Sequence, residues 1–447
     1  MRIHFVGIGG IGMSSIALHE FLSGTEVYGS NIEENERTRY LRKMGIDIFI
    51  GHSERNWKDP DFLVRTPAVS RSNPEVFRAL REKVPVFERI DFLREIVSGK
   101  EQFAVTGTDG KTTTTAMLAH VLKYLKKDPT VFLGGIHSSL EHGNYRKGSD
   151  VFVYELDESD GKFSSFSPNY AIITNARGDH IEKYDWDLGK YKKAFETFAK
   201  SVKEVLVTFA EDEITGKLGM ISFGLNHGTY TIERREQKTW YQEVSIRKNG
   251  KRYGQLVLKV PGLHNALNAL AVFSLLDFLG CDLGVVSSAL EDFEGVKRRF
   301  NVTYADEDRR IFIIDDYAHT PQEVENLLKT TKEIFRSEKI TVIFQPHRYT
   351  RLMREDGNFA RSLREADHVI VTEVFGAYEN ERRISAEMIH ESLMEIGKDS
   401  SFVPNKEDIL KKLEVTPCTV YLFVGAGDII EVSKRFKMKL SDLKKFS

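Results

Sequence analysis

Cysteine is scarce in this chain, with only Cys281 and Cys418 in 447 residues. Two thiols that far apart cannot build a disulfide framework or a cysteine-rich zinc cluster, so a reducing compartment is expected. No apolar run approaches the roughly 18 residues that a membrane-spanning helix needs. The apolar start of the chain is interrupted at Gly7, too early for a signal-peptide core. We therefore expect a cytoplasmic protein without a membrane partner.

An excess of charge of one sign is also absent. The chain has 64 Lys and Arg against 66 Asp and Glu, which gives a formal net charge of -2. Such a balance provides no long-range attraction to nucleic acid or to an anionic membrane surface, so no nucleic-acid partner is expected. An anionic ligand would have to be held by local groups.

What is present is an ordinary folded composition, 41% apolar and 29% charged, in a chain too long for one hydrophobic core. Short β-rich runs alternate with amphipathic stretches, which predicts an α/β fold with largely parallel sheets. Polar or basic breaks near residues 97–100 and 297–300 suggest three domains, 1-98, 99-296 and 297-447. The expected elements are strands at 2–6, 25–29, 102–105, 151–155, 171–175, 311–315, 340–344, 368–372 and 419–424, helices at 14–22, 117–124 and 265–279, and an irregular β-rich segment, open to an antiparallel arrangement, at 228–259.

The strongest local signal is a run of small residues between an apolar strand and a helical pattern. This run is Thr106-Gly107-Thr108-Asp109-Gly110-Lys111-Thr112-Thr113-Thr114. Small residues allow backbone N–H groups to surround phosphate oxygens at a helix N-terminus. Lys111 would reach the β- and γ-phosphates of a nucleotide, and the Thr112 hydroxyl would hold Mg²⁺. Val105 stands where the general pattern has glycine, and the alternative is a glycine-rich turn with a surface lysine.

A phosphate loop needs a carboxylate on a neighbouring strand to hold its metal ion. Glu155 ends the apolar run 151–155, at the strand end where ligands meet a parallel sheet. Three further acids follow it, which belong either to the same site or to a solvated loop: Asp157, Glu158 and Asp160. His180, beside Asp179 and after the run 171–175, either completes the Mg²⁺ shell, contacts substrate, or is an ordinary loop histidine.

A second glycine motif, Gly7-Ile8-Gly9-Gly10-Ile11-Gly12, opens the chain between a strand and a helix. This pattern is typical of a diphosphate cradle in a dinucleotide-binding domain. The acid that would bind an NAD ribose is missing, because the second strand ends in Ser30-Asn31. A nucleotide diphosphate other than NAD fits better, and glycines that serve strand–helix packing alone are the alternative.

In the last third of the chain, polar clusters follow two successive strands. They are Asp315-Asp316-Tyr317-Ala318-His319-Thr320-Pro321 and Phe344-Gln345-Pro346-His347-Arg348-Tyr349-Thr350-Arg351. Arg348 and Arg351, three residues apart, could hold a carboxylate through paired N–H groups. The alternative for each residue is helix capping or surface charge. Likewise, Lys297-Arg298-Arg299 either faces phosphates or forms a solvated linker.

Taken in order, these motifs resemble those of the Mur ligase family over the whole chain. The matching segments are Gly107-Thr108-x-Gly110-Lys111-Thr112, the strand end at Glu155, Asp179-His180, His264-Asn265-Ala266-Leu267-Asn268-Ala269 and Asp316-Tyr317-Ala318-His319-x-Pro321. In this family a residue other than glycine at position 105 is normal. The resemblance implies a Rossmann-like N-terminal domain for a UDP-sugar, a central P-loop ATPase-type α/β domain, and a C-terminal Rossmann-like α/β domain that binds ATP and the amino acid.

Three segments are most similar to the family member that adds L-alanine to UDP-N-acetylmuramate. They are Gly7-x-Gly9-Gly10-x-Gly12-Met13-Ser14, Glu155-x-Asp157-Glu158-Ser159-Asp160 and Phe344 to Arg351. Two departures concern the uridine site: Asn31 replaces a usual aspartate, and Arg65-Thr66-Pro67-Ala68 replaces a usual serine pair.

The resemblance also implies roles for individual residues. It implies Mg²⁺ ligands at Thr112, Glu155 and His180, ATP contacts from Gly107, Thr108, Asp109, Gly110, Lys111, Thr112, Thr113, Asn268, Arg299, Asp316 and His319, and UDP-sugar contacts from Gly9, Gly10, Gly12, Met13 and Ser14. Arg348 and Arg351 would hold the alanine carboxylate, and His347 would help to keep the amine neutral.

The implied reaction transfers the γ-phosphoryl group of ATP to the lactyl carboxylate, and the alanine amine then displaces phosphate from the acyl phosphate. Catalysis would rest on positioning and charge neutralisation, in a site that closes before the chemical step. Three rivals stay open: a sibling ligase that adds a whole peptide, a dehydrogenase that uses the N-terminal glycines, and a nucleotide-gated binding protein without turnover. We expect a monomer or a weak homodimer.

Overall fold

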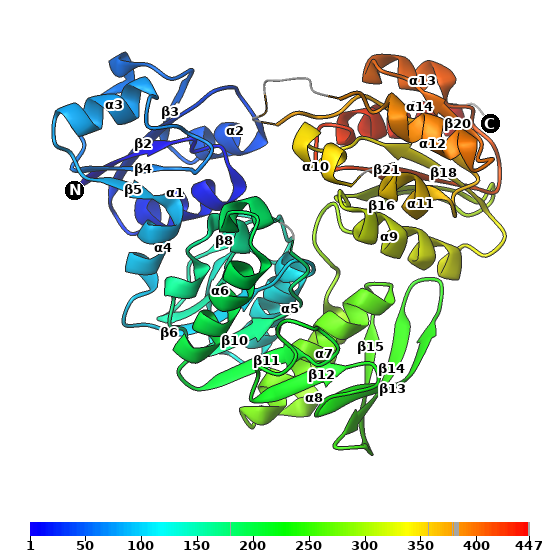
Figure 1. Cartoon of the computed structure of the whole chain (residues 1–447), viewed down its shortest axis with the longest axis horizontal. Coiled ribbons are helices and arrows are strands. Elements are labelled where there is room, and N and C mark those ends of the chain that lie inside the picture. Colours follow the sequence, from blue (N-terminus) through cyan, green and yellow to red (C-terminus); the bar gives the residue numbers. More distant parts are fainter. Residues whose placement is uncertain (179, 356, 378, 380–383, 446–447) are drawn as a thin grey trace. The chain divides into compact units, whose positions relative to one another are not determined.

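The computed structural model describes residues 1–178, 180–355, 357–377, 379 and 384–445, and for 443–445 the backbone alone. Its strands form three sheets, of five, ten and six strands, with helices between them (Figure 1). The predicted three-part α/β architecture is confirmed. By compactness the chain divides into two units: Met1–Arg235 with Val244–Leu258 and Asn265–Val296, and Glu236–Glu243 with Lys259–His264 and Lys297–Ser447.

The five-stranded sheet is parallel throughout, with the order β3-β2-β1-β4-β5. Its elements are β1 (Arg2–Val6), α1 (Ile11–Leu22), β2 (Glu26–Asn31), α2 (Glu36–Lys43), β3 (Asp47–Ile50), β4 (Phe62–Arg65), α3 (Pro74–Arg81), β5 (Val86–Glu88) and α4 (Arg89–Val97). Phe5, Ile16 and Leu41 pack in its core and are at most 2% exposed. Because parallel strands end at one edge, the loop after β1 lies at the edge where β2 and β4 also end.

The ten-stranded sheet has the order β15-β14-β13-β12-β11-β10-β6-β9-β7-β8. Its strands are β6 (Glu101–Thr106), β7 (Thr130–Phe132), β8 (Tyr145–Arg146), β9 (Val151–Glu155), β10 (Tyr170–Ile173), β11 (Val205–Phe209), β12 (Ile221–Gly224), β13 (Tyr230–Gln237), β14 (Gln242–Lys248) and β15 (Lys251–Leu258). Its helices are α5 (Lys111–Tyr124), α6 (Leu188–Ser201), α7 (Leu263–Phe278) and α8 (Leu283–Asp292). The strand β6 pairs in parallel with β9 and with β10, so three strand ends meet at one edge.

The six-stranded sheet has the order β16-β17-β21-β18-β19-β20, and only its β16–β17 pair is antiparallel among the pairs of described residues. Its strands are β16 (Asn301–Asp306), β17 (Ile311–Asp316), β18 (Lys339–Phe344), β19 (His368–Val371), β20 (Ser400–Phe402) and β21 (Thr419–Val424). Its helices are α9 (Pro321–Ile334), α10 (Tyr349–Arg354), α11 (Asn358–Leu363), α12 (Glu387–Glu395), α13 (Ile409–Lys412) and α14 (Ile430–Lys445). Alternate residues of β17 pack into different cores, Phe312 and Ile314 into one and Ile311 and Ile313 into the other. Both faces of this sheet are therefore buried, as expected for parallel strands.

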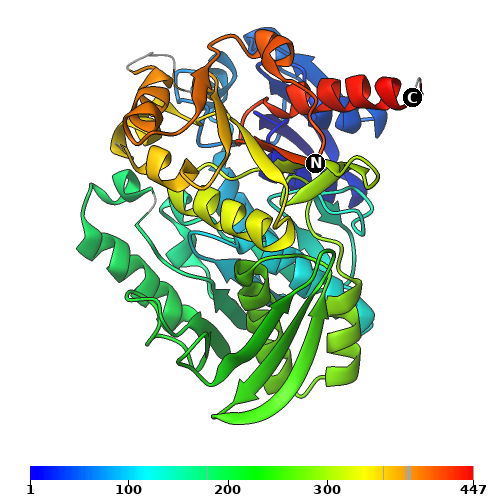
Figure 2. The same ribbon diagram turned by 90° about the vertical axis from the view of Figure 1, so that its right-hand side faces the viewer.

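The element boundaries agree best where strands are apolar and worst where helices begin. The strands predicted at 2–6, 151–155 and 419–424 are found with those limits. The helix expected at 14–22 begins at Ile11, and the one expected at 117–124 begins at Lys111. The segment 228–259 contains three strands, β13, β14 and β15, which form a curved layer in Figure 2. The two-residue connection between β14 and β15 requires an antiparallel pair.

Candidate active site

The phosphate loop leaves β6 at Thr106 and turns back on the neighbouring strand end. Asn175, just beyond β10, holds its shape: its backbone oxygen accepts the Thr108 N–H at 3.0 Å. The Asn175 side chain accepts the Asp109 N–H at 3.0 Å and donates to the Asp109 carbonyl at 3.1 Å. These contacts hold the loop against the strand end of β10, the parallel neighbour of β6.

Two glycines in the loop are required by its geometry. Gly107 and Gly110 have φ angles of +130° and +83°, which disfavour any other residue. A Cβ on Gly107 would lie 2.3 Å from the Thr174 hydroxyl oxygen, and a Cβ on Gly110 would lie 2.6 Å from the Asn268 side-chain oxygen. Asn268, predicted from resemblance, is therefore placed directly against the loop.

Gly110→Ala is expected to weaken ATP binding by about tenfold or more, because both its backbone conformation and the contact with Asn268 would have to change. Gly24→Ala is the matched control, since Gly24 has a φ of +90° and open space around its would-be Cβ. Gly24→Ala introduces the same kind of backbone strain as Gly110→Ala but no close contact with a neighbouring side chain. Calorimetric titration of both variants with ATP checks the prediction, and equal affinities would contradict it.

Lys111, the first residue of α5, folds its ammonium group back into the loop. Its Nζ donates to the carbonyls of Gly107 and Thr108 at 2.6 and 3.0 Å and to Glu158 Oε2 at 2.8 Å. Burial lowers the pKa of Lys111, but the carboxylates of Glu158, Asp157 and Glu155 outweigh it and raise the pKa above its usual value. The loop therefore holds a permanent positive charge.

Two of the acids after β9, Asp157 and Glu158, lie 4.0 and 2.8 Å from the ammonium group of Lys111. Glu158 is 0% exposed, and burial, opposed by Lys111, raises its pKa to about 7. Burial also acts to raise the pKa of Asp157, but Lys111 and the Ser159 N–H bring it well below its usual range. The interpretation of this run as a solvated loop is wrong for Glu158, because its carboxylate is buried against Lys111.

Thr112 and Glu155 are brought together as their positions predict. The Thr112 hydroxyl donates to Glu155 Oε2 at 2.8 Å, and the Gly134 N–H donates to the same oxygen at 3.2 Å. A hydroxyl and a carboxylate oxygen fit Mg²⁺, which usually takes one or two protein ligands and fills its shell with water and phosphate oxygens.

His180 lies at a left-handed position, φ +61°, and its Nδ1 is 3.5 Å from Glu182 Oε1. His180 acts electrostatically to lower the pKa of both Asp157 and Glu158, so it lies within reach of the acids that follow β9. Among the described residues no group of three or more His, Cys, Asp or Glu could hold a metal ion. Asp179, its neighbour in the predicted motif, lies outside the described residues.

The N-terminal glycine loop is anchored on the end of β2. The N–H groups of Gly7 and Ile8 donate to the Ser30 carbonyl at 2.9 and 3.0 Å, and the Gly9 N–H donates to Asn31 Oδ1 at 3.1 Å. Asn31 therefore supports the loop. Helix α1 begins after Gly10, whose position carries no side-chain cap.

The five predicted UDP-sugar residues differ in exposure. Gly10 is exposed, Gly12 is half-buried and Gly9 is buried. Met13 is 1% exposed and packs in the hydrophobic core, and Ser14 is 0% exposed and donates to the Ile11 carbonyl. The Ser14 hydroxyl also accepts hydrogen bonds from Arg37 Nε at 3.3 Å and Asn144 Nδ2 at 2.9 Å, so contacts from outside the helix hold this end of α1.

At the C-terminal sheet, Asp316 ends β17 and accepts two backbone N–H groups at 2.7 Å, from Phe300 and Ala318. Burial raises the pKa of Asp316 to about 6, against the lowering effect of Arg299. Arg299 itself pairs with Glu323 at 3.3 Å. The basic run at 297–299 is thus partly built into the fold rather than a free linker.

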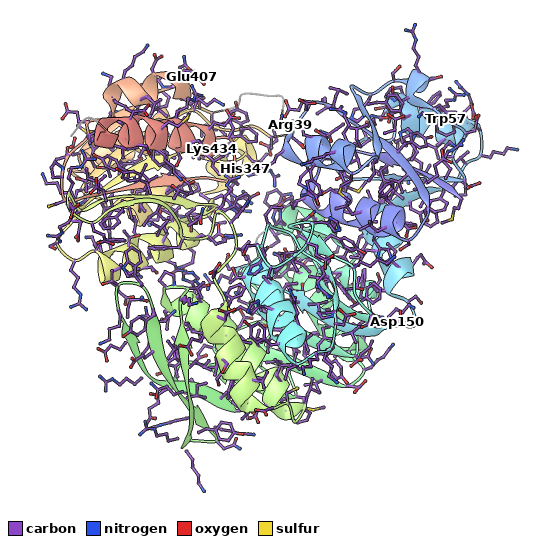
Figure 3. All side chains as sticks on the ribbon, turned by 180° about the vertical axis from the view of Figure 1, so that it is seen from behind. Arg39, Trp57, Asp150, His347, Glu407 and Lys434 are labelled. Carbon is purple, nitrogen blue, oxygen red and sulfur yellow. The ribbon has the colours of Figure 1, made fainter. Side chains whose placement is uncertain are left out.

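Two histidines lie face to edge near the ends of β17 and β18, with ring centroids of His319 and His347 5.8 Å apart (His347 is labelled in Figure 3). Burial lowers the pKa of His319 to about 4 and that of His347 to about 3. Both imidazoles are therefore neutral at neutral pH. Arg351 Nη1 lies 3.2 Å from His347 Nδ1, consistent with that nitrogen accepting a hydrogen bond.

The two predicted carboxylate-binding arginines have different surroundings. Arg351 is 4% exposed. Arg348 is held at a φ of +71°, and its Nε donates to Glu379 Oε1 at 2.9 Å. Such strain in a non-glycine residue is typical of functional sites. Glu379 was not predicted, because nothing in its sequence neighbourhood distinguishes it.

The buried histidines predict an acid sensitivity of the C-terminal unit. In unfolded chain a histidine binds a proton near pH 6.5, but His347 in the folded protein does so near pH 3. Between these values the unfolded state binds more protons, so stability is complete above pH 6.5 and falls as the pH drops. His347→Leu is expected to remove up to about 1.4 kcal/mol per pH unit of this slope.

The measurement is the free energy of unfolding of wild type and variant from pH 7 to pH 4. The difference between them cancels the opposite contribution of Asp316, whose raised pKa favours the folded state on acidification. His368→Gln is the control, because this histidine is about one-third exposed. Parallel curves for wild type and His347→Leu would contradict the prediction.

A lysine inside a glycine loop at a helix N-terminus, with a carboxylate on the adjacent strand end, defines a nucleotide-binding α/β protein with a phosphate loop. Models of the Mur ligase family match the chain in three parts: "Mur ligase family, catalytic domain" at residues 2–101, "Mur ligase middle domain" at 105–276, and "Mur ligase, glutamate ligase domain" at 298–427. The chain belongs to the Mur ligase family.

Its relatives extend over essentially its whole length. The UDP-N-acetylmuramate--L-alanine ligase of Thermotoga petrophila is 60% identical over 439 residues, 98% of this chain and 96% of the relative. The protein of the same name from Carboxydothermus hydrogenoformans is 36% identical over 445 residues, 97% and 95% of the two chains. The crystal structure of UDP-N-acetylmuramate-alanine ligase from Thermotoga maritima is 56% identical, covers 99% of both chains and superposes with a TM-score of 0.92.

A murein peptide ligase from Psychrobacter arcticus shares the fold, with a TM-score of 0.73 at 22% identity over 98% of both chains. None of the helices in the described part of the chain combines the length and the apolar character needed to cross a bilayer.

Proposed function

We propose that this chain is an ATP-dependent ligase that joins L-alanine to the lactyl carboxylate of UDP-N-acetylmuramate, a step of peptidoglycan precursor synthesis. The observation that carries the proposal is the 60% identity with an L-alanine ligase over 98% of the chain, together with the phosphate loop that folds around Lys111. The peptide ligase, in contrast, is similar at 22% identity, which supports the fold alone.

The chemistry starts from a carboxylate, which is a poor acyl donor because oxide is a poor leaving group. A carboxylate oxygen attacks the γ-phosphorus, the bond to ADP breaks, and an acyl phosphate forms. The alanine amine then attacks the acyl carbon and phosphate leaves, taking with it the oxygen that the carboxylate supplied. No side-chain nucleophile is needed, so the residues act by positioning and by charge neutralisation.

Within this proposal, the loop from Gly107 to Thr113 and Asn268 bind ATP, and Lys111 neutralises its terminal phosphate groups. Thr112 and Glu155 would hold Mg²⁺, and His180 would complete the set. Bound there, the ion would polarise phosphate oxygens. The support is the adjacency of the Thr112 and Glu155 oxygens at 2.8 Å.

The domain limits 1-98, 99-296 and 297-447 form part of the proposal. The first domain would bind the UDP-sugar through its glycine loop, at Gly9, Gly10, Gly12, Met13 and Ser14. The third would contribute ATP contacts from Arg299, Asp316 and His319 and hold the alanine carboxylate with Arg348 and Arg351. A neutral His347 supports this arrangement, because an imidazole with a pKa of about 3 adds no charge beside an amine that must be unprotonated to react.

The test is phosphate release from ATP in the presence of Mg²⁺ and UDP-N-acetylmuramate, screened across the twenty amino acids. L-alanine is expected to give the highest kcat/KM. A peptide substrate that outperforms every free amino acid would replace this proposal with the sibling activity. Titration with NAD tests the dehydrogenase alternative. Binding of NAD at the N-terminal glycine loop would contradict the proposal that this loop binds a UDP-sugar.

We also propose that the enzyme acts in the cytoplasm as a monomer or a weak homodimer. Two scattered cysteines and two nucleotide substrates support the compartment. Sedimentation at several protein concentrations tests the oligomeric state, and a stable higher oligomer would contradict it.

A further inference from the structure

The side chain of Arg89, which is not part of the glycine motif, lies at the N-terminus of α1. Arg89 is the first residue of α4, the helix that follows β5 in the N-terminal sheet domain (Figure 1). Its Nη1 is 2.5 Å from the position that a Cβ on Gly12 would occupy. Gly12 therefore leaves room for a guanidinium group beside the diphosphate loop, and any larger residue would displace it.

The other end of this guanidinium reaches the acidic turn of the nucleotide site. Arg89 Nη2 donates to Asp160 Oδ2. Asp160 ends the short 3₁₀ turn Glu158–Asp160, and Glu158 in the same turn holds Lys111 at 2.8 Å. A series of contacts thus runs from Gly12 in α1 through Arg89 to the turn Glu158–Asp160, and from that turn to Lys111 of the phosphate loop.

Arg89 stays charged and has N–H groups to spare. Burial lowers its pKa, but Asp160, Asp157 and Glu155 outweigh this and raise the pKa above the usual value. A guanidinium has five N–H donors, and the hydrogen bond to Asp160 is the one that Arg89 makes with side chains or backbone of the described residues. The side chain is 21% exposed and none of its nitrogens is buried without a partner, so the remaining donors face solvent.

The proposed reaction creates a need for a charge at this place. It brings a carboxylate against a triphosphate, and the approach of two anions is unfavourable unless a cation lies between them. Lys111 already lies on the phosphate side. Arg89 lies between the N-terminal glycine loop and the acidic turn Glu158–Asp160. Its planar guanidinium group can donate two parallel hydrogen bonds to a carboxylate, which a lysine cannot do.

We propose that Arg89 is a substrate-binding residue that holds the lactyl carboxylate of the nucleotide-sugar, with Asp160 fixing the orientation of the guanidinium. This proposal rests on the proposed function, since it takes the UDP-N-acetylmuramate acceptor as given. It differs from the glycine loop's role, because it concerns the reacting end of the acceptor and not its diphosphate.

The experiment compares two ligands that share a UDP group and differ at the lactyl ether: UDP-N-acetylmuramate and UDP-N-acetylglucosamine. Arg89→Gln is expected to weaken calorimetric binding of the first by about tenfold or more and to change the second by less than about twofold. Arg89→Lys, which keeps the charge but loses the fork, is expected to give an intermediate loss on the first ligand only. Arg94→Gln is the matched control on the same helix, where Arg94 donates to Ser165 Oγ at 2.9 Å, and it should bind both ligands like wild type.

Two outcomes would overturn the proposal. Equal weakening of both ligands would assign Arg89 to the diphosphate, and unchanged affinity for both would make the Arg89–Asp160 pair structural. If Arg89→Gln lowers the melting temperature, the comparison is made with Arg89→Lys. For this variant too, weaker binding of both ligands would assign Arg89 to the diphosphate, and unchanged binding of both would make the Arg89–Asp160 pair structural. Binding needs no turnover, so a wild-type protein that binds both ligands but forms no product with L-alanine would count against the proposed function alone.

Discussion

Lys111→Ala is expected to lower ATP-dependent phosphate release by at least about 10²- to 10³-fold. The Lys111 ammonium lies inside the phosphate loop, where three carboxylates hold it charged. Removing it leaves the terminal phosphates without their nearest cation and leaves Glu158 buried beside an empty space. Binding of UDP-N-acetylmuramate should be unchanged, because its glycine loop is anchored on Ser30 and Asn31 and because Arg89 is held by Asp160 and not by Lys111.

The measurement combines a phosphate-release assay with calorimetric titration of the UDP-sugar. Lys123→Ala is the control, since Lys123 is exposed in the last turn of the same helix and should retain full activity. Equal loss of phosphate release and of UDP-sugar binding would contradict the separation of the two sites. Normal phosphate release by Lys111→Ala would contradict the phosphate loop itself.

Arg348→Ala and Arg351→Ala are each expected to raise the KM for L-alanine by about ten- to a hundredfold, with a smaller effect on the KM for ATP. A carboxylate held by an arginine fork loses paired, charge-assisted hydrogen bonds when the fork is removed. Arg351 is 4% exposed, so its removal also leaves a cavity beside His347 and should cost more stability than removal of Arg348.

Initial rates at varied alanine concentration and saturating ATP check this second prediction. Arg361→Ala, an exposed arginine on α11, is the control and should behave as wild type. Unchanged alanine dependence in both site variants would remove the two arginines from the amino-acid site. A rise in the KM for ATP with none for alanine would reassign them to the nucleotide.

The sequence predicted the proximity of Thr112 and Glu155, whose positions are determined by strand ends. Glu155 was expected near Thr112 because it ends an apolar strand beside the phosphate loop, and their oxygens are 2.8 Å apart. Parallel strands bring their carboxyl ends to one edge, so this kind of proximity follows from the pattern alone. The same logic placed Asp316 at the end of β17 and His347 after β18, two parallel strands that β21 separates in the sheet.

The start of α5 was mispredicted for a physical reason. The expected helix began at residue 117, but the observed helix begins at Lys111 and includes four threonines, Thr112 to Thr115. Threonine is a weak helix former, so the pattern before Met117 does not look helical. Packing decides the conformation here, since all four threonines are buried, and the left-handed Gly110 sets the first turn.

Contacts between distant segments could not be derived from the sequence. The acids after β9 were equally compatible with a solvated loop, and only the fold shows Glu158 buried against Lys111, 47 residues away. Arg89 reaches Asp160 over 71 residues from the end of a different sheet domain. No local periodicity encodes such a pair, because each partner taken alone is an ordinary charged residue near a helix end.

The central claim, transfer of the γ-phosphoryl group to the substrate carboxylate, is tested by following oxygen. UDP-N-acetylmuramate with ¹⁸O in both lactyl carboxylate oxygens is converted with ATP and L-alanine, and the released phosphate and the amide product are analysed by mass spectrometry. The acyl-phosphate route predicts one ¹⁸O in the phosphate and one in the new amide carbonyl for each turnover. Phosphate without ¹⁸O, formed while ATP is consumed, would contradict the account.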